Sequence, residues 1–201
     1  NGGTLVTTYW SGIVDENDLC FLGGFPGPLK KVTGIWAEEL DALYDEDVNY
    51  VSIEEGNSLG MKGEYEARIF CDLIHSEGAE VLATYKTDFY KGMPALTCNN
   101  FGEGQAYYIA FRNNDEFLSD FYSSLAKKLT LKRAIEIDLP KGINAQVRMD
   151  EKNEFVFFMN FSSEEKTIDI KDLDLTDMVT GEKVTKEMEI EPYGVRIVRR
   201  K

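Results

Sequence analysis

Few side chains in this sequence could act as a nucleophile, a base or a soft metal ligand. His75 is the only histidine, and the cysteines are Cys20, Cys71 and Cys98. A Ser-His-Asp or Cys-His system would have to use His75. Cys71 precedes it by four residues, so the two would share a face if the segment were helical. No cysteine lies in the Gly-x-Cys-x-Gly or Gly-x-Ser-x-Gly turn that exposes a nucleophile. We therefore expect buried thiols, an ordinary histidine and no catalytic residue.

Metal and cofactor sites are no better supported. Cys71, Asp72 and His75 could meet one ion, but this set is poor in soft ligands for zinc. The Asp-Glu-Asn-Asp run at 15–18 resembles part of a calcium loop without the glutamate that an EF-hand has at its twelfth position. The Gly/Pro-rich run at 23–28 lacks the Gly-Lys-Ser/Thr ending of a phosphate loop, and its prolines donate no N–H. We expect no metal site and no cofactor.

The acidic residues are numerous, but the sequence does not pair them. The 201 residues include 36 Asp and Glu against 22 Lys and Arg, a net charge of −14. Paired carboxylates hydrolyse glycosides, yet no pair stands out among so many acids, and we interpret Asp45-Glu46-Asp47 as solvated surface. This charge argues against nucleic acid and anionic membranes as partners. No apolar run approaches the ~20 residues of a membrane span.

The predicted secondary structure that would position these groups changes near residue 131, from mixed strands and helices to strands alone. Residues 1–131 contain 9 basic and 21 acidic residues, a net charge of −12, and mix strands with helices. Strands are predicted at 4–10, 50–53, 80–85, 95–98 and 105–111, with a hairpin turn at 99–104. Segment 36–43 has apolar residues at helical spacing, and segment 66–74 fits a strand or a helix equally well.

The clearest helix spans about 114–129. Phe117, Phe121 and Leu125 recur at the spacing of one helix face. Asn113 is the expected N-cap, with Glu116 three residues later. We expect this helix to close the first domain.

Residues 132–201 show period-two patterning only. They hold 13 basic and 15 acidic residues, a net charge of −2. Short strands are predicted at 135–137, 145–149, 155–159, 167–170, 187–190 and 195–198. This pattern favours a small antiparallel β-sandwich or barrel. We therefore expect two domains, 1–131 and 132–201.

Several blocks of the sequence resemble one known family. Thr-Thr-Tyr-Trp-Ser-Gly-Ile-Val-Asp-Glu-Asn-Asp at 7–18 and Leu-Gly-Gly-Phe-Pro-Gly-Pro-Leu at 22–29 resemble the start of the middle domain of glycoside hydrolase family 42 β-galactosidases. Further blocks lie at 82–85, 88–97 and 101–110, and those at 179–182 and 192–195 resemble the family's C-terminal β domain. The resemblance covers nearly the whole chain.

The resemblance implies a fold and an assembly. The middle domain of the family would be a class I glutamine amidotransferase-like, flavodoxin-like α/β domain without amidotransferase residues, used to form a homotrimer. The parent would hydrolyse terminal non-reducing β-D-galactose with retention, in a (β/α)8 barrel. No position here matches the family's catalytic glutamates, and a chain of this length could not hold a barrel and anything else. We therefore expect a non-catalytic region that supports and assembles the barrel.

The sequence adds its own indication of self-association. Segment 20–28 is apolar, rich in Gly and Pro, and too irregular to bury itself in regular layers. Because this domain is strongly acidic, contacts between copies must be locally apolar or charge-paired. The cations proposed for such pairs are Lys30, Lys31 and Arg68, and the acids are Asp45 and Glu46.

Two other functions stay open at this stage. A stand-alone carbohydrate-binding module could use Trp10, Trp36, Phe25 or Tyr193 as an aromatic platform. An amidotransferase-like hydrolase would use Cys71 or Cys98. Three widely spaced cysteines without a pairing pattern favour a reduced environment, so we expect a cytoplasmic protein.

Overall fold

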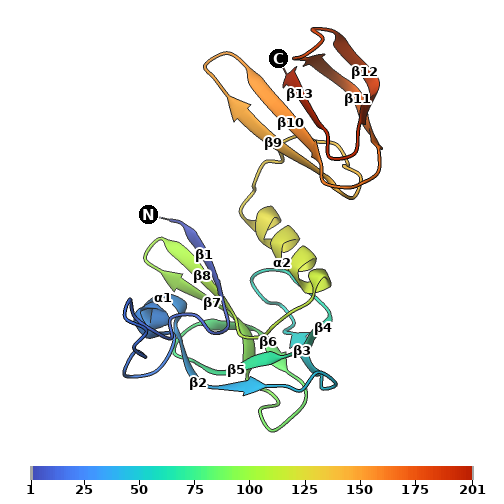
Figure 1. Cartoon of the computed structure of the whole chain (residues 1–201). Coiled ribbons are helices and arrows are strands. Elements are labelled where there is room, and N and C mark those ends of the chain that lie inside the picture. Colours follow the sequence, from blue (N-terminus) through green and yellow to red (C-terminus); the bar gives the residue numbers. More distant parts are fainter. Residues whose placement is uncertain (1, 201) are drawn as a thin grey trace. The chain divides into compact units, whose positions relative to one another are not determined.

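The computed structural model describes residues 2–200, apart from the side chain of Asp172. It contains two compact units, Asn1–Thr130 and Leu131–Lys201, called unit 1 and unit 2 below (Figure 1). No helix among the described residues is long and apolar enough to cross a membrane.

Unit 1 is built on a six-stranded sheet in the order β1-β8-β7-β6-β3-β4. The strands are β1 (Thr4–Thr8), β3 (Asn49–Ile53), β4 (Glu64–Ala67), β6 (Glu80–Tyr85), β7 (Pro94–Phe101) and β8 (Gly104–Ile109). Only β1 and β8 run parallel, and every other neighbouring pair is antiparallel. β7 and β8 form the predicted hairpin, closed by Phe101 opposite Gly104.

A two-stranded ribbon and the helices cover this sheet. β2 (Ile35–Ala42) pairs with β5 (Phe70–Ser76), and α2 (Asp115–Lys128) follows β8. A short turn, η1 (Gly27–Leu29), leads into the four-residue helix α1 (Lys30–Thr33). Because side chains alternate across a strand, β8 packs in two directions. Its Tyr107 contacts the core with α2, and its Tyr108 contacts Ile35 and Ile74 of the ribbon.

The helix α2 follows the predicted pattern closely. Phe117, Phe121 and Leu125 are its buried residues and pack on aromatic rings of the sheet. The N-cap is Asn114 rather than the predicted Asn113, since the Asn114 side chain accepts a hydrogen bond from Phe117 N at 2.9 Å. Asn113 instead donates to the Phe111 carbonyl.

The flavodoxin-like, amidotransferase-like α/β fold expected for the first domain is wrong. That fold needs a mostly parallel sheet with crossover helices on both faces. Here a single pair of strands is parallel, and hairpins connect β3 to β4, β6 to β7 and β7 to β8. The described helices are α2, α1 and η1, of which two have four residues or fewer. Unit 1 is therefore mainly antiparallel β structure.

Two segments form strands although the sequence pattern predicted helical spacing for one of them and did not decide between strand and helix for the other. Residues 36–43 lie largely in β2, which pairs with β5 and carries a bulge between Ala37 and Glu39. Segment 66–74 holds the end of β4 and most of β5, separated by Ile69 with a φ of 67°.

Unit 2 is a single antiparallel sheet in the order β12-β11-β13-β10-β9. Its strands are β9 (Ile143–Met149), β10 (Glu154–Asn160), β11 (Lys166–Asp177), β12 (Lys183–Ile190) and β13 (Val195–Arg200). Its core gathers Val156, Phe158, Ile168, Ile190 and Val198.

Unit 2 is neither the expected two-sheet sandwich nor the expected closed barrel. The described strands form one sheet, with β9 and β12 as its edges, rather than two packed sheets or a closed ring. Register shifts along β11, with Lys171 at a φ of 52°, bend the sheet around its core. The predicted strand 135–137 is not a strand, although Ile135 and Ile137 are buried in this core.

Candidate functional site

The segment between β1 and η1, residues 9–26, forms a structured loop called the N-terminal loop below (dark blue in Figure 1). Val14 and Cys20 form an antiparallel bridge, and Asp15 Oδ1 accepts hydrogen bonds from Asn17 N and Leu19 N. Asp15 thus stabilises a tight turn, and this turn explains why residues 15–18 resemble part of a calcium-binding loop. Gly12 has a φ of 64°, and a Cβ there would lie 2.5 Å from the Pro26 carbonyl oxygen. The loop is therefore ordered by its own backbone.

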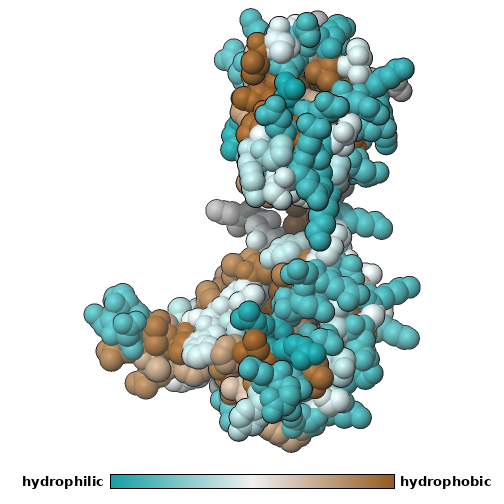
Figure 2. Space-filling view, turned by 45° about the vertical axis from the view of Figure 1, so that its right-hand side comes forward, coloured by the Kyte–Doolittle hydropathy of each residue, from teal (hydrophilic) through white to brown (hydrophobic). Residues whose placement is uncertain are grey.

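This loop nevertheless leaves large apolar side chains in solvent. Leu22 is 99% exposed, Leu19 64% and Val14 42%. Cys20 is exposed as well, so the expectation of buried thiols is wrong for this cysteine. Figure 2 shows a largely hydrophilic surface on which hydrophobic residues, in brown, gather in patches. Apolar side chains held outward by an ordered loop are typical of a surface that another surface covers.

Trp10 fixes the start of the loop to the ribbon. Its φ is 58°, which is strained for a bulky residue. Trp10 N donates a hydrogen bond to Asp72 Oδ2 at 3.2 Å, and its ring meets Phe70 edge-on. The Tyr108 hydroxyl donates to the same Asp72 oxygen at 2.6 Å. The carboxylate of Asp72 therefore joins β5, β8 and the N-terminal loop.

Asp72 also lines a cavity of about 210 Å³, called the Asp72 pocket below. The other lining residues are Trp10, Ile13, Phe25, Ala37, Glu38, Glu39 and Leu40. Asp72 is 4% exposed, and this burial raises its pKa, while the bonds from Tyr108 and Trp10 oppose the shift. The pocket thus combines apolar walls with a carboxylate that is costly to keep charged.

Glu38, one of the lining residues, bonds to a histidine that belongs to a stacked pair of rings. His75 Nε2 lies 2.7 Å from Glu38 Oε2, and the His75 ring stacks on Trp36 at 4.9 Å. Both His75 and Glu38 are exposed. Trp36 is therefore engaged with His75, whereas Trp10 remains 53% exposed.

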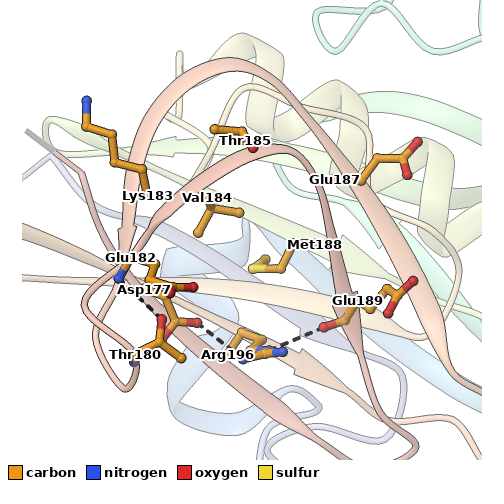
Figure 3. Close-up of a pocket in the computed structure, with 10 residues that line it drawn as sticks. All are labelled: Asp177, Thr180, Glu182, Lys183, Val184, Thr185, Glu187, Met188, Glu189 and Arg196. Atoms are coloured by element: carbon orange, nitrogen blue, oxygen red, sulfur yellow. Dashed lines mark hydrogen bonds and ion pairs between the residues drawn. The ribbon is translucent and has the colours of Figure 1, made fainter.

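Unit 2 has a separate surface pocket of about 360 Å³ along β12 (Figure 3). Arg196 lies on its floor, bonding to Asp177 Oδ2 and to the Glu189 carbonyl, each at 3.3 Å. Burial raises the pKa of Asp177, but backbone N–H groups of Thr180 and Val179 and the Arg196 charge hold it below its ordinary value. Arg196, Asp177 and the Glu189 carbonyl therefore satisfy one another inside the pocket.

The cysteines and the histidine do not form a catalytic pair. Cys71 and Cys98 are buried, and burial raises the pKa of Cys71 to about 11 and also raises that of Cys98. Cys71 and His75 both lie in β5, four residues apart, which separates them by about 13 Å along a strand. Thiols that resist ionisation, away from any base, are poor nucleophiles.

Metal ligands are equally scattered. Among the described residues, no three His, Cys, Asp or Glu side chains are grouped closely enough to hold an ion. The acids Asp45, Glu46 and Asp47 are exposed. Arg68 bonds to Glu66, and Lys30 lies 3.9 Å from Glu77.

Sequence reasoning did not predict that Asp72 is buried and lines an apolar pocket. Its partners Trp10 and Tyr108 lie 62 and 36 residues away along the chain. Asp72 stands in an apolar run, Ile-Phe-Cys-Asp-Leu-Ile, and that setting was the available signal of burial.

Models of two protein families match this chain. Residues 1–132 match the β-galactosidase trimerisation domain, and residues 142–200 match the β-galactosidase C-terminal domain. The two matches are consecutive and together cover most of the sequence.

Curated relatives agree with these matches. The chain is 99% identical over 201 residues to β-galactosidase Pbg of Clostridium perfringens and 46% identical over 199 residues to β-galactosidase BglY of Alicyclobacillus acidocaldarius. It spans 29% of the length of each of these relatives.

Solved structures agree as well. The β-galactosidase of Rahnella sp. R3 superposes with a TM-score of 0.85 at 48% identity, covering 99% of this chain and 28% of that one. The β-galactosidase of Bacillus circulans sp. alkalophilus gives 0.87 at 42% identity, covering 100% and 29%. The chain therefore belongs to the family 42 β-galactosidases, of which it carries the trimerisation domain and the C-terminal domain.

Proposed function

We propose that this chain is the part of a retaining β-galactosidase that assembles and supports the catalytic barrel, and that the parent hydrolyses terminal non-reducing β-D-galactose. The match of residues 1–132 to the trimerisation domain carries this proposal. The 29% share of the relatives' length leaves room in such a parent for the barrel. The chain itself then contributes assembly rather than chemistry.

The assembly we propose is a homotrimer in which the N-terminal loop contacts a neighbouring copy. Leu22, Leu19 and Val14 supply apolar area that is free in the isolated chain. The loop is held by its own bridge and by the Asp15 turn, so ordering it on contact costs little further entropy. An apolar contact also suits a domain whose net charge of −12 repels its copies.

The cations proposed to form ion pairs between copies already have partners within their own copy. Arg68 and Lys30 already have acidic partners within unit 1, Glu66 and Glu77. Arg68 and Lys30 would have to exchange partners in order to bridge Asp45 or Glu46 of a neighbour. Apolar burial at the loop is therefore the larger contribution that we propose.

Sedimentation equilibrium of the chain and of its Leu22→Asp variant tests this assembly. The chain is expected to associate with increasing concentration toward a trimer, and Leu22→Asp is expected to weaken this association at least tenfold. The matched control is Val179→Asp in unit 2, since Val179 is also an exposed apolar residue, at 81%. Equal association of all three proteins, or a dimer as the limiting species, would contradict the proposal.

We also propose a cytoplasmic location. Cys20, Cys71 and Cys98 are all free thiols in the structure. Free thiols are usual in a reducing compartment, where disulfides are rare. Mass spectrometry of the protein alkylated directly in cells would show these cysteines unoxidised if the location is right.

A further inference from the structure

We propose that the catalytic barrel of the parent packs against one face of the unit 2 sheet, and that the barrel supplies a carboxylate to Arg199 there. The inference rests on the proposed function, because the barrel is the occupant that it names. It adds the surface and the residue through which unit 2 would hold the barrel.

The surface is the side of the sheet that faces away from the core of unit 2, called the outer face below. Side chains alternate between the two faces along a strand. Val156 and Phe158 of β10 lie in the core, so the residues on either side of each lie outward. The register places alternate residues of β13 beside them on the same face. The outer face therefore holds Phe155, Phe157 and Met159 from β10 and Arg199, Ile197 and Val195 from β13.

The outer face is apolar, although the core of unit 2 lies on the opposite side. An antiparallel sheet with one packed face usually carries polar side chains on the other. Here β10 is apolar on both faces, in the run Phe-Val-Phe-Phe-Met at 155–159. The core cluster contains none of the outer residues, and Val195 is 56% exposed. Such a face is typical of a surface that another surface covers.

The charges on the outer face call for an acidic cover. In β9, β10 and β13, the outward residues include Arg148 and Arg199 on either side of Phe155 and no Asp or Glu. Arg148 donates to the Val147 carbonyl, and neither arginine forms an ion pair among the described residues. Two unpaired arginines are notable in a protein with a net charge of −14. A cover that carries a carboxylate would complement them.

Arg199 gives the most direct indication of a missing partner. Its Nε is buried and has no hydrogen-bond partner among the described residues. Buried donors without an acceptor are rare, because they lose their bonds to water. A carboxylate can accept two hydrogen bonds from one guanidinium. An Asp or Glu side chain in the cover would therefore give Arg199 the acceptor that it lacks.

The length of the relatives favours the barrel as the occupant. The chain spans 29% of β-galactosidase Pbg, so most of a parent of that length lies outside this structure. A cover joined to the same chain acts at a high effective concentration, so a face of modest area is sufficient. A second copy of the outer face would bring further arginines and no carboxylate, which disfavours pairing of this face with itself.

The test measures how fast iodoacetamide modifies a cysteine on the outer face, in the isolated chain and in the full-length parent. Both proteins carry Cys20→Ser, because Cys20 is an exposed native thiol. Val195→Cys places a thiol on the outer face, and Thr185→Cys, at an exposed β-branched residue of β12, is the matched control. We expect the Val195→Cys protein to react about tenfold more slowly in the parent than in the isolated chain. The Thr185→Cys protein should react equally fast in both.

A further variant tests the carboxylate. Arg199→Met keeps a long side chain without the charge, so it should speed the modification of Val195→Cys about threefold in the parent. It should leave the rate in the isolated chain unchanged. Arg112→Met, at an exposed arginine of unit 1, is the matched control and should change neither rate. Equal rates for Val195→Cys in the chain and the parent, or an equal effect of Arg199→Met in both, would overturn the proposal.

Two measurements on the same parent separate this inference from the earlier proposals. Turnover of a nitrophenyl β-galactoside together with equal modification rates would retain the proposed function and reject the outer face. Protection of Val195→Cys without turnover would support the outer face and contradict the proposed function. Leu22→Asp should leave the protection unchanged, and protection lost with Leu22→Asp would assign the cover to a neighbouring copy and overturn the inference.

Discussion

Asp72 shows how one side chain connects several parts of unit 1. Its carboxylate takes hydrogen bonds from Trp10 and Tyr108, and its backbone carbonyl accepts one from the Tyr85 hydroxyl. The N-terminal loop, the ribbon and the main sheet therefore meet at this residue. Burial of the carboxylate raises its pKa above the ordinary 3.8, so its charged form is disfavoured in the folded state.

The first prediction concerns the stability of unit 1 against pH. The pKa of Asp72 is higher in the folded state than in the unfolded state. The contribution of Asp72 to stability is therefore fully present at a pH below its unfolded-state pKa, and it is lost as the pH rises through its folded-state pKa. Asn at this position keeps an acceptor for Tyr108 and Trp10 without a buried charge. Asp72→Asn should therefore gain stability relative to the parent at pH 7 compared with pH 3.5.

Urea unfolding at the two pH values measures this difference. Glu103→Gln is the control, because an exposed acid should show little pH-dependent change. A difference between Asp72→Asn and the parent that is the same at both pH values would show that the Asp72 carboxylate is not disfavoured by folding.

At the scale of elements, the sequence pattern predicted correctly those helices and hairpins whose contacts are local in the chain. The spacing of Phe117, Phe121 and Leu125 marked one face of α2, and the structure buries these three residues. The hairpin of β7 and β8 was equally readable, since its turn lies between two apolar strands.

Elements that depend on distant partners were not predictable in this way. Segment 36–43 has helical spacing, but pairing with β5 makes most of it a strand, and a bulge at Ala37 and Glu39 disturbs the period of two. The flavodoxin-like fold came from the resemblance to the family, whereas the hairpins of unit 1 make its sheet mainly antiparallel. The Asp72 pocket was also hidden, because its hydrogen-bonding residues are far apart along the chain.

The second prediction separates the two asparagines before α2. Asn114 accepts a hydrogen bond from Phe117 N, whereas Asn113 only donates to a carbonyl. Asn114→Ala should cost about 1 kcal/mol of stability, the usual effect of losing an N-cap. Asn113→Ala should cost less than half of that. Chemical denaturation of both variants gives the comparison, and equal losses would mean that the cap is shared between the two residues.

At the scale of the whole molecule, the chain carries two of the domains of a family 42 β-galactosidase. The matched regions are the trimerisation and C-terminal domains, and they account for 29% of the length of the relatives. The sequence indicated the family through the blocks at 7–18 and 22–29, and it offers no nucleophile motif. In the structure, Cys71 and Cys98 are also unsuited to act as nucleophiles, because they are buried and their pKa values are raised.

The third prediction is that the isolated chain does not hydrolyse a nitrophenyl β-galactoside. A retaining glycosidase needs two carboxyl groups about 5–5.5 Å apart on either side of the glycosidic bond, one as acid and one as nucleophile. The Asp72 pocket does gather carboxylates, but Asp72 is tied to Tyr108 and Trp10, and Glu38 is paired with His75. These carboxylates therefore hold structure rather than a sugar. Turnover should stay at the level of buffer while β-galactosidase Pbg of Clostridium perfringens, assayed beside it, is active. Any reproducible turnover by the chain would contradict this prediction, and its disappearance in Asp72→Asn would place the chemistry in unit 1.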